Sequence, residues 1–411
     1  MAVGAGVNGS DGGEIVQEQA AVLGSAWHEY AAALTSADEA IRSNESFSED
    51  TAVNAYAYLA GLVERYHDLV LRAGDPRYPR WVRGGATPGR DAMNPNADTF
   101  YLYAPVKGSE SYRIFGRLGS VTQTIIGSYL PRIPGDTSLS GAHDRLTAED
   151  LKVGRDGSIE IAVGPERPPN TDNWLATSAD VDQLKIYEVY GDWEHEQRGT
   201  FTIHHEPSLG RRRGDPTAEE LAERIRRVPA AAVRLASYWQ QASRGVAGRT
   251  TPNAFTELVH PQIAMLGALF SKCVWELHDA EALIIEARPP EDSRYWGWSA
   301  CSLFGTTLDY ANRQTSLNHT QAGVDEDGVV RLVLTAQDPG VQNWIDVGGH
   351  PVGQLTWRVS TPTAPSTPTT RVVPFDDVRL HLPAATRRVT SSERSSEITR
   401  RQRQIARRYA E

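Results

Sequence analysis

Two stretches of alternating sequence decide the fold of this 411-residue chain: DGSIEIAV at residues 156–163 and DGVVRLVL at residues 327–334. Each begins with an Asp-Gly dipeptide, which favours a tight turn between strands. Each continues with alternating apolar and polar residues, the pattern of a β-strand with one buried face. The two stretches therefore predict the same turn and strand at two places in the chain.

The sequence that follows each stretch also repeats. A proline-containing loop leads to an Asn-Trp pair, Asn173-Trp174 in the first copy and Asn343-Trp344 in the second. The Trp lies 18 residues after the Asp of the turn in the first copy and 17 in the second, and a strand led by Gln-Leu follows. We interpret the repeat as a duplicated β-sandwich unit. Each Asn-Trp pair is predicted to form a corner, with the indole in the core and the amide bonded to loop backbone.

The predicted fold class is therefore α+β, with two related antiparallel β-sandwich units, each preceded by helices. Apolar residues at three- and four-residue steps predict the helical parts, including the stripes at residues 217–242 and 253–285. The predicted divisions are a disordered tail (1–13), an N-terminal helical hairpin (14–83), a first β unit (84–210), a helical segment (215–290), a second β unit (291–383) and a basic C-terminal helix or tail (384–411).

Charge is distributed unevenly along the chain. The formal net charge is −10, but residues 387–411 hold eight Arg and three Glu, so this tail carries +5 and the rest carries −15. An acidic body argues against a nucleic-acid partner, because phosphate binding needs a cationic surface. The opposite charges of the tail and the body would allow the basic tail to dock on a neighbouring subunit, and this docking would give a homo-oligomer.

Composition excludes several other classes. No run of 18 apolar residues occurs, so no membrane-spanning helix and no membrane partner are expected. The first 14 residues lack the basic and apolar regions of a secretory signal. The only cysteines, Cys273 and Cys301, cannot form a disulfide scaffold, and a cytoplasmic location is expected.

Sequence motifs for cofactors and metals are missing. The chain has no HExxH, CxxC, GxSxG, Walker A or GxGxxG sequence in a suitable context, so we predict no cofactor and no metal site. His204, His205 and Glu206 end a predicted strand. Because adjacent residues of a strand face opposite sides, the two imidazoles are not expected to share a metal ion.

Two polar clusters could carry chemistry: RDAMNPNADTFY at residues 90–101 and LDYANRQTSLNH at residues 308–319. One interpretation is a buried hydrogen-bond network that orders loops. The other is a pocket that orients a small molecule. On the second interpretation His319 is the general acid or base, Arg313 holds a developing oxyanion and Tyr310 orients or donates. The predicted binding residues are Asn94, Asn96, Tyr101, Tyr103, Trp296, Asn318 and His350.

Residues 294–375 resemble a bacterial family named domain of unknown function 1214. The similar stretches include Ser316-Leu317-Asn318-His319, Asp338-Pro339-Gly340 with Asn343-Trp344-Ile345-Asp346, and Gly349-His350. Asn94-Pro95 and the strand at 101–106 resemble the segment that precedes this domain in longer members. The resemblance covers roughly residues 50–380 and implies β-sandwiches with helices. It implies no reaction and no catalytic residues, because the family has no assigned function.

Three functions remain open from the sequence. The first is a cofactor-independent enzyme that acts on a small, largely apolar metabolite by general acid/base chemistry (isomerisation, elimination, cyclisation or hydrolysis), with secondary metabolism as one setting. The second is a non-catalytic sandwich that binds a carbohydrate or metabolite through the same aromatic residues. The third is a structural module. Fold alone does not decide among them.

Overall fold

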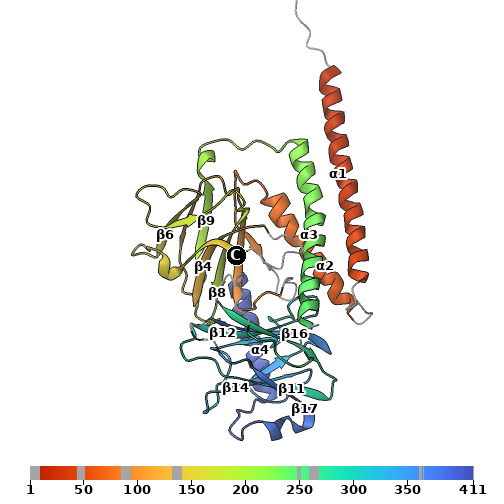
Figure 1. Cartoon of the computed structure of the whole chain (residues 1–411), viewed down its shortest axis with the longest axis vertical. Coiled ribbons are helices and arrows are strands. Elements are labelled where there is room, and N and C mark those ends of the chain that lie inside the picture. Colours follow the sequence, from red (N-terminus) through yellow and green to blue (C-terminus); the bar gives the residue numbers. More distant parts are fainter. Residues whose placement is uncertain are drawn as a thin grey trace, which may run out of the picture.

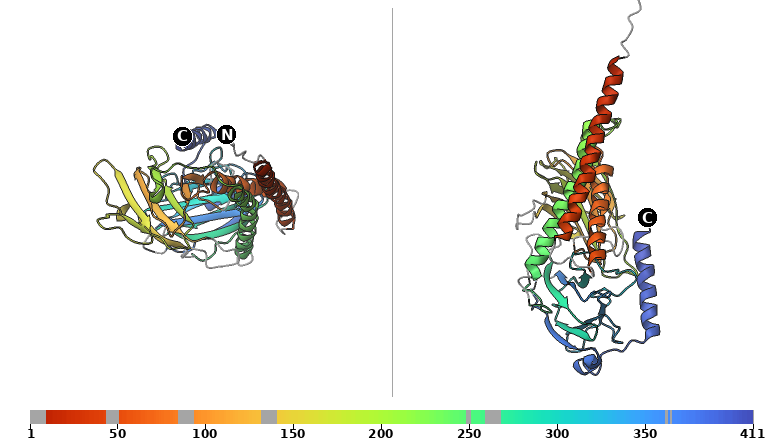
Figure 2. Two further views of the ribbon diagram at one scale, coloured as in Figure 1. Left: turned by 90° about the horizontal axis from the view of Figure 1, so that it is seen from above. Right: turned by 90° about the vertical axis from the view of Figure 1, so that its right-hand side faces the viewer.

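The computed structural model describes residues 10–43, 51–84, 94–131, 141–247, 251–258, 268–360, 363 and 365–410. Two β units lie one below the other, and three helices cover one side of the upper unit (Figure 1). A fourth helix, α4, lies on a different side of the molecule, as the turned views show (Figure 2). Residues 1–9 of the predicted disordered tail lie outside the described residues, and residues 10–13 belong to the first helix.

The first unit consists of two sheets. Sheet A has the order β1-β2-β8-β4-β5 and sheet B the order β7-β6-β3-β9. The strands are β1 (Val82–Gly84), β2 (Thr99–Pro105), β3 (Tyr112–Arg117), β4 (Gln123–Tyr129), β5 (Ala142–Thr147), β6 (Ser158–Gly164), β7 (Trp174–Ala176), β8 (Gln183–Val189) and β9 (Thr200–His205). Apolar residues of both sheets, such as Ile114, Ile126 and Ile161, meet in one core.

The second unit repeats this arrangement. Sheet C has the order β10-β16-β12-β13 and sheet D the order β15-β14-β11-β17. The strands are β10 (Leu269–Glu276), β11 (Glu281–Ala287), β12 (Tyr295–Cys301), β13 (Ser316–Asn318), β14 (Val330–Thr335), β15 (Trp344–Asp346), β16 (Val352–Ser360) and β17 (Thr369–Pro374). Its core holds Trp275, Trp298 and Trp357, and the last two stack with ring centroids 5.2 Å apart.

Strand order confirms the duplication predicted from the sequence. Without β1, the four strands of sheet A occupy the same positions in the chain as those of sheet C, and the same holds for sheets B and D. Even the single parallel pairing recurs, between β6 and β7 and between β14 and β15. The chain is therefore an α+β protein with two related sandwich units.

The Asn-Trp pairs form corners, as predicted, but their indoles do not lie in the sandwich cores. Asn173 exchanges hydrogen bonds with the backbone of Lys152, and Asn343 does the same with Gly323. Each indole N–H donates to a carbonyl of the preceding strand, at 3.2 Å for Trp174 and 3.0 Å for Trp344. Because these bonds hold each ring against strand backbone, neither indole belongs to the central core of its sandwich.

Three helices pack together beside sheet A: α1 (Ser10–Arg42), α2 (Ala52–Tyr66), which continues into the π-helix η1 (His67–Arg72), and α3 (Ala218–Ala247). They correspond to the predicted N-terminal hairpin and the stripe at 217–242. The helix α3 continues through Pro229. Side chains of α1, η1 and α3, among them Tyr30, Leu69 and Val228, pack on Tyr103 of β2.

The predicted helix over residues 253–285 is wrong for its described part, whereas residues 259–267 lie outside the described residues, and the second unit begins before the predicted boundary at 291. Residues 269–287 are the strands β10 and β11. Alternate residues of β10, such as Cys273 and Trp275, face the core. The same apolar residues also match a helical period, so pairing with β16 and β14, which are distant in sequence, decides the outcome.

Candidate functional site

The two units meet at a buried polar contact, which we call the junction. The segment from Asn94 to Asp98, just before β2, lies on the outer face of sheet C, the face turned away from that sheet's core. Asn94, Asn96 and Asp98 are at most 8% exposed. They contact Tyr295, Ser299, Cys301, Asn318, Thr356 and Arg358 of the second unit. The two polar clusters of the sequence therefore do meet in space.

Asp98 is the centre of the junction. One carboxylate oxygen, Oδ1, accepts hydrogen bonds from the Trp193 indole and the Asn318 amide, both at 2.8 Å. The other, Oδ2, accepts one from the Tyr295 hydroxyl at 2.6 Å. Asn96 donates to the same hydroxyl at 2.8 Å. The carboxylate is completely buried and has donors on both oxygens, so this part of the junction is a satisfied network that joins the two units.

His319 lies at the edge of this network. Its ring contacts Tyr295 edge-on at 5.7 Å between centroids, and burial lowers the pKa of His319 below its ordinary value. The ring atom Nδ1 is buried without a hydrogen-bond partner among the described residues. Gly191 leaves room for the ring, because a Cβ there would lie 2.9 Å from the imidazole. The imidazole is thus held neutral beside Asp98.

The structure separates His319 from the other two predicted catalytic residues. Arg313 is exposed and forms an ion pair with Asp346 at 2.9 Å. Tyr310 is buried, and its hydroxyl bonds the hydroxyl of Tyr409 in α4. The three predicted catalytic residues therefore have different partners, and their grouping as one catalytic set stays a prediction. The partners differ because residues 308–319 turn through a loop, so neighbours in sequence face different surroundings.

The remaining predicted binding residues also divide. Asn94, Asn96, Asn318 and Tyr101 belong to the junction; the Tyr101 hydroxyl accepts a hydrogen bond from the Asn96 backbone at 3.0 Å. Trp296 lies in the core of the second sandwich. His350 is close to Asn54 of α2, and burial and the charge of Arg313 lower its pKa. Tyr103 faces the helices.

A tyrosine cluster covers the outer face of sheet A next to the junction. It consists of Tyr101, Tyr103, Tyr129 and Tyr187, with each of the first three rings within 6.4 Å of Tyr187. Tyr129 is 1% exposed, and its hydroxyl has no hydrogen-bond partner among the described residues. A buried hydroxyl without a hydrogen-bond partner costs free energy, so a hydrogen bond from the Tyr129 hydroxyl to a bound molecule would be favourable.

Basic side chains surround the tyrosine cluster. Arg65 of α2 lies 4.1 Å from the centroid of Tyr103, and Lys185 of β8 lies 4.2 Å from that of Tyr129. On the facing sheet C, Arg358 donates to the Asn94 carbonyl at 2.8 Å, and its Nη1 is buried with no partner in the described structure. Burial, with the charge of Arg358, lowers the pKa of the nearby Lys272 to about 8.

The sequence prediction missed Lys185, Lys272 and Arg358, although a signal was present. β8 reads QLKIYEV and β16 reads QLTWRVS, so Lys185 and Tyr187 occupy the positions of Thr356 and Arg358 in the repeat. The residues between them face the cores. A period-two count from the shared Gln-Leu would therefore have placed Lys185, Tyr187 and Arg358 on the outer faces of sheets A and C.

The basic tail forms the helix α4 (Ser391–Tyr409), which begins with a capping box of Thr390 and Glu393. Arg394, Arg401 and Arg408, seven residues apart, are each at most 7% exposed. Arg401 and Arg408 both lie 4.5 Å from the centroid of Trp193, whose indole donates to Asp98. The basic helix thus packs on the body of its own chain, with Arg401 and Arg408 bonded to backbone carbonyls of Tyr310, Ser316 and Ala97.

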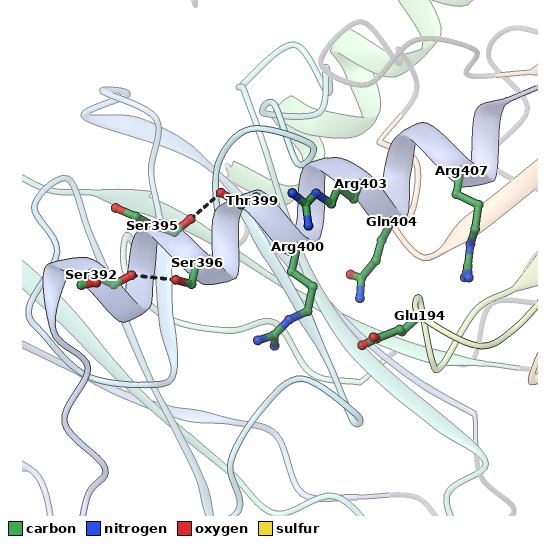
Figure 3. Close-up of a pocket in the computed structure, with 9 residues that line it drawn as sticks. All are labelled: Glu194, Ser392, Ser395, Ser396, Thr399, Arg400, Arg403, Gln404 and Arg407. Carbon is green, nitrogen blue, oxygen red and sulfur yellow. Dashed lines mark hydrogen bonds between the residues drawn. The ribbon is translucent and has the colours of Figure 1, made fainter.

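The outward face of α4 carries a shallow pocket of about 630 Å³ (Figure 3). Arg400, Arg403 and Arg407 line it together with Glu194 of the first unit and with serines of the first turns of α4. Arg407 already donates to the Trp193 carbonyl at 2.7 Å. The predicted homo-oligomer stays a prediction. In the described part of the chain, no three His, Cys, Asp or Glu side chains are grouped to hold a metal, and no helix could span a membrane.

The fold and the junction define a class: an α+β protein made of two fused, related sandwiches. The family model described as "Protein of unknown function (DUF1214)" matches residues 130–190. The predicted resemblance is therefore confirmed, and the chain carries a DUF1214-type region. The match lies in the first unit, whereas most of the residues that suggested the resemblance lie in the second unit, at 294–375, which this match does not include.

One solved structure shows the same fold over most of the chain. The crystal structure of an uncharacterized protein from Burkholderia cenocepacia has a TM-score of 0.78 and 22% identity, over 87% of this chain and 99% of that one. The VPA0106 protein from Vibrio parahaemolyticus has a TM-score of 0.42 and 13% identity, over 79% of this chain and 99% of that one. No curated protein matches the sequence.

Proposed function

We propose that the protein binds a small molecule with an apolar body and an anionic group between the tyrosine cluster and Arg358. The observation that carries this proposal is the pair of buried donors without a partner, Arg358 Nη1 and the Tyr129 hydroxyl, on facing sheets. The Arg358 guanidinium already donates to the Asn94 carbonyl, but its buried Nη1 has no acceptor among the described residues, and an anionic ligand would supply one. The tyrosine rings would contact the apolar part.

A matched pair of probes tests this proposal. Naphthalene-2-carboxylate and its uncharged amide have the same aromatic body, so calorimetry on both isolates the contribution of the anionic group. We expect the wild type to bind the carboxylate at least about tenfold more tightly, and Arg358→Met to remove the difference. Arg403→Met, on the outward face of α4, is the control. Equal affinity for both probes, or no binding, contradicts the proposal.

A catalytic form of this function is favoured by Lys272. The sequence suggested a cofactor-independent acid/base enzyme, and a buried amine with a pKa of about 8 suits a general base near neutral pH better than the separated set around His319. If a bound ligand is turned over, the rate should rise with pH through about 8. Lys272→Met should abolish turnover and retain affinity, whereas Lys152→Met should change neither.

His319→Ala distinguishes the original hypothesis from this one. Loss of turnover with retained affinity in that variant, and not in Lys272→Met, would return the catalytic role to His319. Ligands that bind but never react would leave the non-catalytic binding function. We also propose a cytoplasmic location, supported by the two buried thiols, Cys273 and Cys301.

A further inference from the structure

A second set of reactive side chains lies at the far end of the first unit. Strand β9 ends at His205, and the short turn that follows contains Ser208. The Ser208 hydroxyl lies 2.7 Å from Nδ1 of His205, and Nε2 of the same ring lies 2.5 Å from Oε2 of Glu110. We propose that Ser208, His205 and Glu110 form a nucleophilic site that accepts acyl groups from esters.

The carboxylate of this set is fixed before any substrate arrives. The Lys107 ammonium bonds Glu110 at 2.8 Å and, with His205, holds the pKa of this carboxyl below its ordinary value. The Glu110 carboxylate lies against Nε2 of His205 as a close contact, although Nε2 has no aligned hydrogen bond in the described residues; in the site we propose, the proton is on Nε2 and Nδ1 is the acceptor that faces Ser208. This is the arrangement in which a base, oriented by a third group, activates a hydroxyl nucleophile.

The exposure of each side chain fits its role in the proposed site. His205 is 5% exposed, packed on the Tyr112 ring at 5.0 Å, so the imidazole keeps one orientation. Ser208 is half-buried, and Leu209 beside it is 60% exposed. An incoming ester can therefore reach the hydroxyl, and an apolar acyl chain can lie against the leucine.

The duplicated unit shows that the fold does not need this histidine. Tyr112 of β3 pairs with Val163 and His205, whereas Leu283 of β11 pairs with Leu334 and Val372. Val163 and Leu334 each come seven residues after the Asp of the repeated turn, so Val372 is the counterpart of His205. The counterpart of Glu110 is Glu281. The second sandwich thus retains the acid, forms the same strands and lacks the base.

The chemical step is balanced by the residues and water. Ser208 Oγ bonds the carbonyl carbon of the ester while its proton moves to Nδ1 of His205. The bond to the alcohol oxygen breaks, and the departing alkoxide takes that proton. Water then cleaves the acyl-serine by the same proton transfers in reverse, and the net products are a carboxylic acid and an alcohol.

Covalent labelling of the full chain tests the site. A fluorophosphonate should form one adduct that peptide mass spectrometry maps to Ser208, and p-nitrophenyl acetate should give an acetyl group at the same residue. His205→Gln should lower the labelling rate by about 10²-fold or more, and Ser208→Ala should remove the adduct.

Two controls keep the outcome decisive. Ser109→Ala changes an exposed serine beside Glu110, and His204→Gln changes the neighbouring exposed imidazole; both should label at the wild-type rate. Circular dichroism of every variant reports whether it is folded. Labelling of folded wild-type protein that is absent, that maps to other residues, or that is equally fast in folded His205→Gln overturns the proposal.

Discussion

At the scale of single residues, the chain buries ionisable groups in two different ways. The completely buried Asp98 carboxylate accepts hydrogen bonds from three donors, the Trp193 indole, the Tyr295 hydroxyl and the Asn318 amide. Glu188, in β8, accepts one hydrogen bond from the Gly199 backbone, and its Oε2 has no partner in the described residues. Burial consequently raises the pKa of Glu188 to about 7.

The raised pKa of Glu188 predicts a pH dependence of stability. Between the ordinary carboxyl value of about 4.3 and 7, the unfolded chain has lost this proton and the folded chain still holds it. The free energy of unfolding should therefore fall as the pH rises through this window. The expected loss is about 3 kcal/mol.

Glu188→Gln should remove this loss, so the variant should be the more stable protein at pH 8 and similar to the wild type at pH 4.5. Urea denaturation at both pH values measures the difference, with exposed Glu166→Gln as the control for one fewer carboxylate. Parallel stability curves for wild type and Glu188→Gln would show that Glu188 does not cause the effect.

At the scale of elements, α4 is the part that the charge pattern described least well. The sequence predicts a basic helix or tail at 384–411, but a run of arginines there is typical of an exposed surface. Burial of Arg394, Arg401 and Arg408 depends on carbonyls, Asp98 and Trp193, all far away in the sequence. No local pattern reports such partners.

Truncation of one buried arginine should destabilise the protein strongly. Arg401 donates to the carbonyls of Tyr310 and Ser316 and stacks on Trp193. Arg401→Ala should lower the free energy of unfolding by about 3 kcal/mol, because it leaves acceptors and the charge of Asp98 without compensation. The exposed Arg403→Ala should change it by less than about 0.5 kcal/mol. Similar values in chemical denaturation would mean that the buried face of α4 contributes little.

The helix-to-strand error at residues 253–285 has a different cause. Apolar residues there satisfy both periods, so the local pattern leaves the choice open, and only the repeat could have decided it. The strand β3, which pairs with the strand after the Asp-Gly turn of the first copy, has its counterpart in β11, and the sequence comparison did not extend far enough to reach it. The repeat itself is local and strong, and for that reason the two sandwiches could be predicted.

At the scale of the whole molecule, the two sandwiches are joined by polar contacts. Asp98 bonds Tyr295 and Asn318 across the junction, and α4 contacts both units through Arg401 and Arg408. The sequence placed Asn94, Asn96, Asn318 and His319 near one another correctly. It could not separate Arg313 and Tyr310 from them, because that depends on which way a loop turns.

This connection predicts cooperative unfolding. A melt of the wild type followed by calorimetry should give one transition, with the calorimetric enthalpy equal to the van't Hoff enthalpy, because neither unit can lose the junction alone. In Arg401→Ala the two units should separate into two overlapping transitions. Two resolved transitions in the wild type would mean that the sandwiches are thermodynamically independent.

The position of α4 in the chain also sets an order of events during synthesis. The helix follows every described strand, so both sandwiches leave the ribosome before the arginines that complete the junction. Until then Asp98 and Trp193 face water, and the nascent chain can adjust how its two halves meet. The helix α4 therefore completes the junction last. A chain that stops before α4 would leave the junction exposed to the proteases of the cell.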